Sequence, residues 1–563
     1  MVDRIIDQIE GAEGVGRHEI GQITAGSLSK GLRMKLHSGE SVEDIRAGKF
    51  VVVDGDKNQY FSMITDVELS TSAPGIEDNP PARENRLLQH VLSGTTAYGT
   101  VELRPMLMLP KSMSGDIVEE PRPVKSIPAH FSPVVNATAD DVGRIFGREC
   151  DDIKYFNIGT PLDMQEENIP VCLNLERFVE RSNGIFGKSG TGKTFLTRIV
   201  LCGIIKNNQA VNLIFDMHSE YGWEGTFEGS GGSVRGLKQY FQDKVSVFTL
   251  DPESSRRRGV RTDYDVRIPY SQVTAEDVML LQDELNLTPT AAETCFMLVN
   301  QFKKKWLSEL IQMDGTAVKE FCAAHNVNEA AMAALQRKLR VLTESCSSFL
   351  INDGAGLMDD DAVPQILSYL RSGKHVVIEF GQHAQPLRYM LVANILTRRI
   401  HRDWVKQKEE SLGGGGSKPF PLVITIEEAH KFLGPQLASQ TIFGTIAREM
   451  RKYNVTLLVV DQRPSGIDSE ILSQIGTKIV CLLNDENDIS AVLTGVSNSS
   501  ALRGILASLD SKQQALVLGH AVPMPVVVHT REYDTEEFRL SMGNISNDER
   551  IKMIESEIDK DFS

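Results

Sequence analysis

The sequence predicts an α/β protein with a parallel sheet, a small β-barrel before it and a group of helices inserted into it. From Val179 onward, apolar strand-like stretches alternate with amphipathic helices, the pattern of a parallel sheet covered on both faces. Roughly residues 15–115 hold short alternating stretches separated by Gly and Asp-Gly turns, which favours a small barrel. Between Val273 and Leu350 apolar residues recur at helical spacing instead, so this segment is expected to be a helical insertion.

The expected strands of the parallel sheet are short apolar runs bounded by turn residues. The Pro-rich stretch 121–133 is expected to link the barrel to them. The candidate strands are Asn183–Phe186, Val211–Asp216, Val245–Leu250, Val376–Phe380, Leu422–Ile426, Val455–Val460, Lys478–Leu483 and Ala515–Leu518.

The composition is that of an ordinary soluble protein. Of 563 residues, 41% are hydrophobic and 24% charged, and no run approaches the roughly 20 apolar residues of a membrane span. The N-terminus lacks the basic start and apolar middle of a secretory signal, so we expect a cytoplasmic protein without membrane contact. Seven cysteines, an odd number without a CxxC pair, favour neither a disulfide framework nor a zinc ribbon.

The net charge of −16 argues against a surface covered with nucleic-acid contacts, because such contacts require clustered Lys and Arg. A ring with an acidic outside and a basic central channel fits the same net charge. Composition alone therefore leaves the partner open.

A phosphate-binding loop is predicted where GKSGTGKT fits the pattern GxxxxGK[ST]. The apolar stretch NGIF precedes the loop and the helical stretch FLTRIVLCGII follows it, so backbone N–H groups at a helix N-terminus can hold phosphate. Lys193 is expected to reach the β- and γ-phosphates, and the Thr194 hydroxyl to bind Mg²⁺. The candidate nucleotide-binding residues are Gly187, Lys188, Ser189, Gly190, Thr191, Gly192, Lys193 and Thr194.

Two carboxylates, Glu427 and Glu428, follow the apolar strand Leu422–Ile426 in the arrangement of a Walker B motif. Glu427 is expected to bind Mg²⁺ together with Thr194, and Glu428 to polarise the attacking water. Glu427 stands where Asp is commoner, which lengthens the arm and keeps the charge. The alternative is a solvated acidic pair at the start of a helix. The implied ligands are ATP, with GTP as the other possible nucleotide, and Mg²⁺.

The order of the two motifs narrows the fold class. Between Lys193 and Glu427 the chain has room for at least one strand and for the helical insertion. This order fits a RecA-like P-loop ATPase core of the additional-strand type, in which a further strand separates the two motif strands.

Three further segments resemble the HerA/FtsK group of ATPases, and HerA in particular. They are DMHSEYG at 216–222, IAREMRKY at 446–453 and VDQRPS at 460–465. The resemblance implies that Asp216 and Glu220 lie beside the nucleotide and order metal or water, although Ser219 stands where the family has Gly. It also implies that the amide of Gln462 senses the γ-phosphate.

A cationic helix face is expected at Arg448, Arg451 and Lys452, because Arg451 and Lys452 follow Arg448 by three and four positions. Such a face is either solvated or the source of an arginine finger for the next subunit's ATP site. The resemblance favours Arg451 as the finger, with Arg448 as the runner-up.

The resemblance covers nearly the whole chain and implies a HAS barrel, a helical bundle and a subunit-bracing arm. FtsK proteins usually add membrane segments and a winged-helix reader, and neither is seen in this sequence. The expected parts are 1–135 for the barrel and linker, 136–272 and 356–534 for the two parts of the ATPase core, 273–355 for the helical bundle and 535–563 for the arm.

The strongest basic cluster is 256–258, three consecutive arginines with Arg261 close behind. It is either a channel-facing contact for phosphates or a solvated loop. Lys303, Lys304 and Lys305 are expected on the surface, beside a buried Trp306. Without a base-reading motif, DNA binding is expected to be largely independent of sequence.

The function implied by the resemblance is a homo-hexameric, ATP-driven translocase or helicase on double-stranded DNA. HerA proteins are typically paired with a NurA nuclease, and bacterial relatives with sirtuin-type NAD-hydrolysing proteins or other nucleases in antiphage defence, so an effector protein is an expected partner. Two alternatives are an ATPase scaffold that activates an effector without moving DNA, and a protein-moving ATPase of the secretion type.

Overall fold

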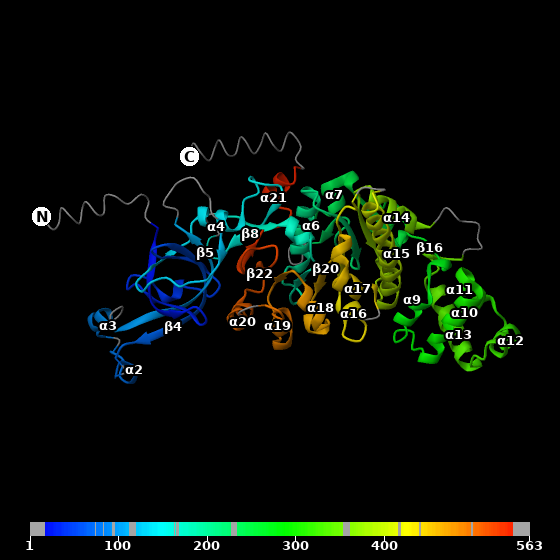
Figure 1. Ribbon diagram of the computed structural model, residues 1–563, viewed down its shortest axis with the longest axis horizontal. Helices are drawn as coiled ribbons and strands as arrows, with labels where there is room; N and C mark the ends of the chain where they lie inside the picture. The colour runs from blue at the N-terminus through cyan, green and yellow to red at the C-terminus, as the bar shows by residue number, and fades with distance from the viewer. Residues whose placement is uncertain are drawn as a thin grey trace. The chain divides into compact units, whose positions relative to one another are not determined.

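The computed structural model groups the chain into two compact units (Figure 1). The first contains the described residues within Met1–Asn174, Ile479–Asn484 and Val496–Arg531, and the second those within Leu175–Lys478, Asp485–Gly495 and Glu532–Ser563. The structure describes residues 17–73, 75–82, 84–92, 96–111, 120–162, 164, 168–226, 233–352, 361–414, 418–438, 441–496 and 499–543.

The first unit contains a closed antiparallel barrel, which confirms the predicted barrel (Figure 1, blue). The Pro-rich stretch 121–133 does not lead out of it as expected, because the strand that follows, Pro133–Asn136, pairs with two other strands of the barrel. Pairing between β2 and β5 closes the sheet, with Met34 opposite Val101. Alternating apolar side chains from the strands, including Ile23, Val51 and Ile64, fill the interior. The strands in sheet order are β2 (Gly31–Leu36), β1 (Glu19–Ser27), β7 (Pro133–Asn136), β3 (Phe50–Asp54), β4 (Asn58–Thr71) and β5 (Ala97–Pro110), with the short β6 (Arg122–Pro123) added at β5.

A second, smaller group of strands in the first unit differs from the prediction. The candidate strand Ala515–Leu518 lies within β22 (Gln514–Gly519), which pairs antiparallel with β23 (Val526–Thr530), whereas a parallel neighbour was expected. The reason is the short connection between β22 and β23, since a parallel pair needs a crossover of a dozen or more residues. The antiparallel order continues through β8 (Tyr155–Pro161) and β9 (Val171–Asn174).

Helix α4 (Ala139–Phe146) also belongs to the first unit, and side-chain hydrogen bonds cap its N-terminus. Thr138 and Asp141 form a capping box, in which each side chain bonds the other's backbone N–H group. Helix α20 (Ser499–Ser508) is the other long helix of this unit.

The second unit is built on a parallel sheet, as predicted. Six of the candidate strands match its members to within one residue at either end. Strand β20 lies between β10, which leads into the phosphate loop, and β19, which ends in Glu427. This confirms the additional-strand order. The strands in sheet order are β15 (Tyr264–Asp265), β14 (Val245–Thr249), β18 (His375–Glu379), β11 (Val211–Asp216), β19 (Leu422–Glu427), β20 (Val455–Asp461) and β10 (Asn183–Phe186). The candidate strand Lys478–Leu483 is shorter in the structure, as β21 (Thr477–Val480).

Helices pack on this sheet because its strands, apart from the short β15, are buried along their whole length. Helix α6 (Lys193–Lys206) contacts β10 and β11, and α14 (Ala362–Arg371) contacts β18 and β11. Helix α17 (Ile442–Glu449) contacts β20 and the long α15 (Pro386–Leu412).

The helical insertion is confirmed between β16 (Ile268–Pro269) and β17 (Leu350–Ile351) (Figure 1, green). Its helices have side-chain caps from Thr288, Asp314 and Asn328. A buried ion pair with an N···O distance of 2.6 Å joins Asp277, on the first helix of the insertion, to Arg398 of α15. The helices are α9 (Ala275–Leu280), α10 (Pro289–Phe302), α11 (Trp306–Gln312), α12 (Gly315–His325) and α13 (Glu329–Ser345).

Two further expectations concern membrane-spanning helices and the C-terminal arm. Among the helices within the described ranges, none is long and apolar enough to span a bilayer. Of the expected arm, the structure describes α21 (Glu536–Ser541), while residues 544–563 lie outside the described residues.

His375, at the start of β18, is expected to make the stability of the fold depend on pH. Its Nδ1 atom accepts the backbone N–H of Asn212 at 3.1 Å, and burial lowers its pKa to about 3. The folded pKa is thus below the unfolded value of about 6.5, so the unfolded chain binds an extra proton and the folded state loses stability as the pH falls from 6.5 toward 3, by up to about 1.4 kcal/mol per pH unit. We expect the melting temperature of His375→Gln to fall less steeply than that of the wild type on acidification, with exposed His130→Gln as the control. Parallel curves for wild type and His375→Gln would contradict this.

Candidate nucleotide site

The phosphate loop joins β10 to α6 in a conformation that requires glycine. Gly190 and Gly192 have φ of 77° and 90°, a region that favours glycine, and a Cβ on either would meet nothing within 4 Å. Gly192 is the N-cap of α6 and leaves the first amides of this helix without a side-chain cap. An open approach to uncapped amides at a helix N-terminus suits phosphate.

Lys193 is folded back onto the loop that carries it. Its Nζ donates to the Lys188 carbonyl at 2.7 Å, and the Thr191 hydroxyl donates to the same oxygen at 2.7 Å. Phosphate oxygens are stronger acceptors than a carbonyl, so this ammonium can exchange one acceptor for another without leaving the loop. Thr194 follows in the first turn of α6 and is partly buried.

Glu427 is a buried carboxylate that is only partly hydrogen-bonded. It is buried at the end of β19, and one carboxylate oxygen accepts the Tyr221 hydroxyl at 2.9 Å. The other oxygen has no hydrogen-bond partner among the described residues. Burial, together with the charges of Asp216 and Glu220, raises the pKa of Glu427 to about 8.

An unpaired buried carboxylate oxygen is costly unless a positive charge compensates it. Mg²⁺ fits this position, because it is usually held by one or two protein ligands, with water and phosphate completing the shell. A larger cage of His, Cys, Asp or Glu is not found within the described part of the chain, and Mg²⁺ does not require one.

Glu428, the second acid, is held by Gln462, which in turn contacts the phosphate loop. The Gln462 amide donates to Glu428 Oε1 at 3.3 Å, and the Gln462 carbonyl oxygen accepts the hydroxyl of Ser189. Gln462 therefore bridges the phosphate loop and the second acid. The backbone of Glu428 has a φ of 50°, a conformation that is uncommon outside glycine and concentrates at functional sites.

Asp461 connects the loops around the site and was missed by the sequence analysis. Its carboxylate accepts the backbone N–H groups of His430 and Arg463, each at 2.7 Å, and contacts His430 Nδ1 at 3.0 Å. Its carbonyl accepts the N–H of Gly187 at 3.3 Å. The bond to Asp461 raises the pKa of His430, whose Nε2 lies 3.8 Å from Glu428. The only sequence signal was the position of Asp461 at a strand end beside Gln462.

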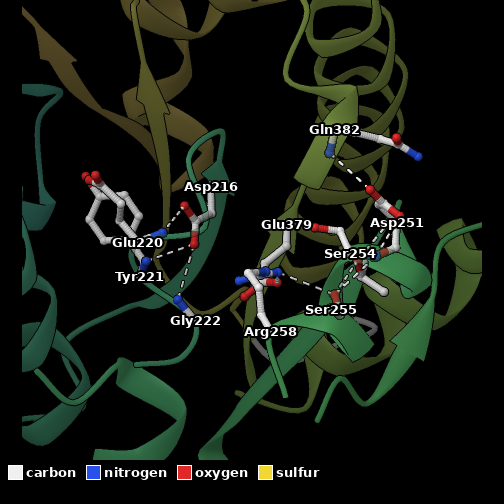
Figure 2. A network of polar contacts seen from close by, with 11 residues as sticks. Asp216, Glu220, Tyr221, Gly222, Asp251, Ser254, Ser255, Arg258, Glu379 and Gln382 are labelled. Carbon is white, nitrogen blue, oxygen red and sulfur yellow. Dashed lines mark hydrogen bonds and ion pairs between the residues drawn. The ribbon is translucent and has the colours of Figure 1, made fainter. Parts of the chain in front are cut away.

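Asp216 organises its own turn instead of facing outward. Figure 2 shows its carboxylate directed at three backbone N–H groups, those of Glu220 and Tyr221 at 2.8 Å and Gly222 at 3.2 Å. Both oxygens are therefore occupied, and burial raises the pKa of Asp216. Ser219 adopts a φ of 57°, a positive value that glycine adopts readily. Either residue therefore fits this turn. The structure brings Glu220 into this turn, with its side chain partly exposed.

Tyr221, also missed by the sequence analysis, links this turn to the acid pair. Its ring is fully buried, and its hydroxyl donates to Glu427, which lies on the neighbouring strand. Burial raises the pKa of Tyr221 well above its usual value, so the phenol stays protonated and acts as a donor.

The expected cationic helix face is corrected by the structure. Helix α17 ends at Glu449 and a 3-10 turn, η7 (Met450–Tyr453), follows, so Arg448 and Arg451 do not share one α-helical face. The chain turns here because Asn454, with φ of 60°, leads directly into β20.

The two arginines differ in how they are held. Arg448 donates to the Ala438 carbonyl at 3.2 Å and lies 3.5 Å from Glu470 and 3.9 Å from Asp468. The Arg451 side chain is 60% exposed, with Glu180 at 4.0 Å. Arg451 is thus the more accessible of the two to a second chain.

Comparisons with known proteins agree with this architecture. Residues 156–400 match the family model of the central domain of helicase HerA, and residues 20–120 match that of the HAS barrel domain. The DNA double-strand break repair helicase HerA of Sulfolobus acidocaldarius is 23% identical over 496 residues, which cover 87% of this chain and 90% of the relative. The protein of the same name from Pyrococcus furiosus is 24% identical over 430 residues, or 73% and 74% of the two chains.

Among solved structures, the bacterial conjugative coupling protein TrwB is 11% identical with a TM-score of 0.45, covering 70% of this chain and 92% of that protein, which is a remote likeness. The two matched domains occur in this chain in the order HAS barrel, then central domain, and the phosphate loop lies within the second of them. The chain therefore contains a HAS barrel domain followed by a HerA central domain, and it is similar to HerA helicases over most of its length.

Proposed function

We propose that this chain hydrolyses ATP with Mg²⁺ at its phosphate loop and uses the reaction to move duplex DNA through a ring of identical subunits. The observation that supports this most is the bridge made by Gln462 between Ser189 and Glu428. An amide that can bond the γ-phosphate thereby touches the carboxylate that can activate water.

Binding would rest on the loop and the start of α6. Phosphate oxygens would meet the uncapped amides of this helix, and Lys193 would exchange the Lys188 carbonyl for phosphate. Thr194 and Glu427 would hold Mg²⁺, which supplies charge neutralisation of the phosphates when bound.

Water activation would be the task of Glu428, which would accept a proton from the attacking water. A γ-phosphate that takes the Gln462 amide would break the bridge to Glu428. The loop that follows Gln462 would then differ between the bound and the empty states, which is how hydrolysis would reach the rest of the subunit.

The exposure of Arg451 supports a ring. A guanidinium inserted into the neighbour's site would stabilise the charge that develops on the γ-phosphate. Six copies per ring is the assembly that the family resemblance implies, and two chains per site is the smallest arrangement that this proposal requires.

DNA is the proposed substrate because the relatives compared above are named as DNA double-strand break repair helicases. The proposed partner is an effector protein, a NurA-like nuclease or a sirtuin-type NAD-hydrolysing protein, docked on the barrel. Its role would be in DNA-end processing or antiphage defence, in the cytoplasm.

Steady-state ATP hydrolysis with and without duplex DNA tests this function. We expect DNA to raise the rate of the wild type, and Lys193→Ala to lower it by about 10²–10³, the usual cost of removing one donor to the transition-state charge. Lys406→Ala, which removes an exposed ammonium on α15, outside the phosphate loop, is the control. A rate that responds to an added effector protein and not to DNA would contradict the motor and support a scaffold.

A further inference from the structure

The arginine cluster singled out in the sequence is split by the structure into two roles. It lies on α8 (Pro252–Arg257) and the following residues to 261, which we call the arginine turn. Arg256, Arg257 and Arg261 are exposed, and their guanidinium groups make no hydrogen bond or ion pair with any residue that the structure describes. Three cationic groups within six residues are thus available to a partner.

Arg258 is also partly exposed, but it differs from these three because its guanidinium pairs with a buried carboxylate. Figure 2 shows its guanidinium on the carboxylate of Glu379, with an N···O distance of 2.7 Å. Glu379 is fully buried at the end of β18, and its second oxygen has no hydrogen-bond partner among the described residues. Arg258 therefore supplies the charge that compensates a buried carboxylate.

Asp251 also joins helix α8 to the residues that follow β18. This buried carboxylate caps α8 through the N–H of Ser254 at 3.0 Å and accepts the N–H of Gln382 at 3.1 Å (Figure 2). Together with Arg258, these bonds hold the arginine turn at two points, to the last residue of β18 and to the segment that follows it. A movement of this segment would thus move the exposed arginines.

The strand end in turn contacts the loop 216–222 of the nucleotide site. Glu379 and Asp216 are opposite one another on neighbouring strands, and the N–H of Phe380 donates to the Asp216 carbonyl at 3.3 Å. A Cβ on Gly222 would lie 2.7 Å from Glu379 Oε1, so this carboxylate packs directly against the loop. Tyr221 of the same loop bonds Glu427.

We propose that the arginine turn is a contact surface for the phosphodiester backbone of nucleic acid, and that Arg258 and Glu379 couple this surface to the loop 216–222. The coupling rests on the function proposed above, whereas the contact surface does not. Arg258 and Glu379 act as positioning residues, because they reach the nucleotide site through other groups.

Nucleic acid fits this surface better than an acidic protein segment does. Guanidinium groups bind phosphate oxygens in pairs, and a row of them on a chain of net charge −16 is a local exception to its composition. Protein interfaces are instead centred on buried aromatic or aliphatic side chains, and among the described residues 251–262 no large hydrophobic side chain is exposed. Glu253 is an exposed acid on the same helix, so the surface is not uniformly positive.

The contact surface is tested by the salt dependence of DNA binding to the full chain. Arg256→Ala/Arg257→Ala is compared with Lys303→Ala/Lys304→Ala, which removes two equally exposed charges elsewhere. For the arginine pair we expect weaker binding of a labelled duplex in fluorescence anisotropy, and a salt slope smaller by about 0.9 for each phosphate that the variant no longer neutralises. The lysine pair should bind as the wild type does. Equal effects of both pairs, or no effect of the arginine pair, would overturn the proposal, and the second result would leave an acidic protein as the partner.

The coupling is tested by Glu379→Gln, which removes the charge that holds Arg258 and keeps the shape. We expect duplex binding to be retained, since the three exposed arginines remain, while the ratio of ATPase rates with and without DNA falls toward one. The matched control is Asp277→Asn, which breaks another buried ion pair, between α9 and Arg398 of α15, outside the arginine turn. Arg258→Lys should keep part of the stimulation. A stimulation ratio unchanged in Glu379→Gln, or lowered equally in Asp277→Asn, would overturn the coupling.

The same measurements distinguish a failure of the contact surface from a failure of the proposed motor function. If DNA binding depends on Arg256 and Arg257 but DNA never raises the ATPase rate of the wild type, the surface stands, and the motor and the coupling both fail. If DNA raises the rate and the arginine pair binds duplex as the wild type does, the motor stands and the surface fails.

Discussion

Replacing Glu428 by Gln is expected to lower ATP turnover by about 10²–10⁴, the usual contribution of a positioned general base. The change is nearly isosteric and keeps an oxygen in place, but an amide cannot take up the proton of the attacking water. Nucleotide binding should be retained, because the phosphate loop and Glu427 are untouched. Glu428 is suited to this role by its position, beside Gln462 and 3.8 Å from His430.

The measurement is steady-state phosphate release together with the binding of a fluorescent ATP analogue. Glu449→Gln removes an exposed carboxylate at the end of α17 and is the control, with an expected rate near that of the wild type. Wild-type turnover in Glu428→Gln would mean that another group activates the water. Loss of analogue binding would assign Glu428 a structural role.

Much of the sheet could be predicted from the sequence because its strands are short apolar runs that need no distant information. Asn183–Phe186 and Val211–Asp216 were predicted to the residue and form β10 and β11. The phosphate loop was equally local, since glycines at 190 and 192 adopt the positive φ that its pattern demands. The antiparallel pairing of β22 with β23 was not foreseen, because apolar runs do not reveal the direction of their neighbours.

The polar contacts within the site could not be read from the sequence. Tyr221 and Glu427 are separated by 206 positions, and Ser189 and Gln462 by 273, so only the folded sheet brings each pair together. Asp461 carried no signal of its own beyond a strand end, yet its carboxylate joins the turns at His430 and Arg463. These are tertiary contacts, which local periodicity does not encode.

Charged clusters were the least predictable part of the sequence. Three consecutive arginines look alike in sequence, but Arg258 is paired with a buried glutamate while Arg256 and Arg257 are exposed. Likewise, the helical spacing of Arg448 and Arg451 suggested one face, and the helix ends between them. Helix ends and ion-pair partners are set by packing, which decides where a flexible cation points.

Replacing Arg451 by Ala is expected to lower ATP turnover by about 10³–10⁵, the range for arginine fingers in phosphoryl transfer. The guanidinium is 60% exposed and lies 4.0 Å from Glu180, so its removal should leave the fold of its own subunit intact. Nucleotide binding should change little, since the effect falls on the transition state. Lys452→Ala, the loss of the adjacent exposed cation, is the control and should keep the wild-type rate. A fast Arg451→Ala would shift the role to Arg448.

The claim that each ATP site is shared between two subunits is tested most directly by mixing two inactive variants. Arg451→Ala subunits keep a complete phosphate loop and Glu428, while Glu428→Gln subunits keep Arg451. Co-expressed rings, purified through a different tag on each variant, should hydrolyse ATP well above either variant alone, because some interfaces combine an intact loop with an intact arginine. Mixed rings as inactive as the two parents, or Arg451→Ala and Arg448→Ala chains that are each as active as the wild type, would contradict a shared site.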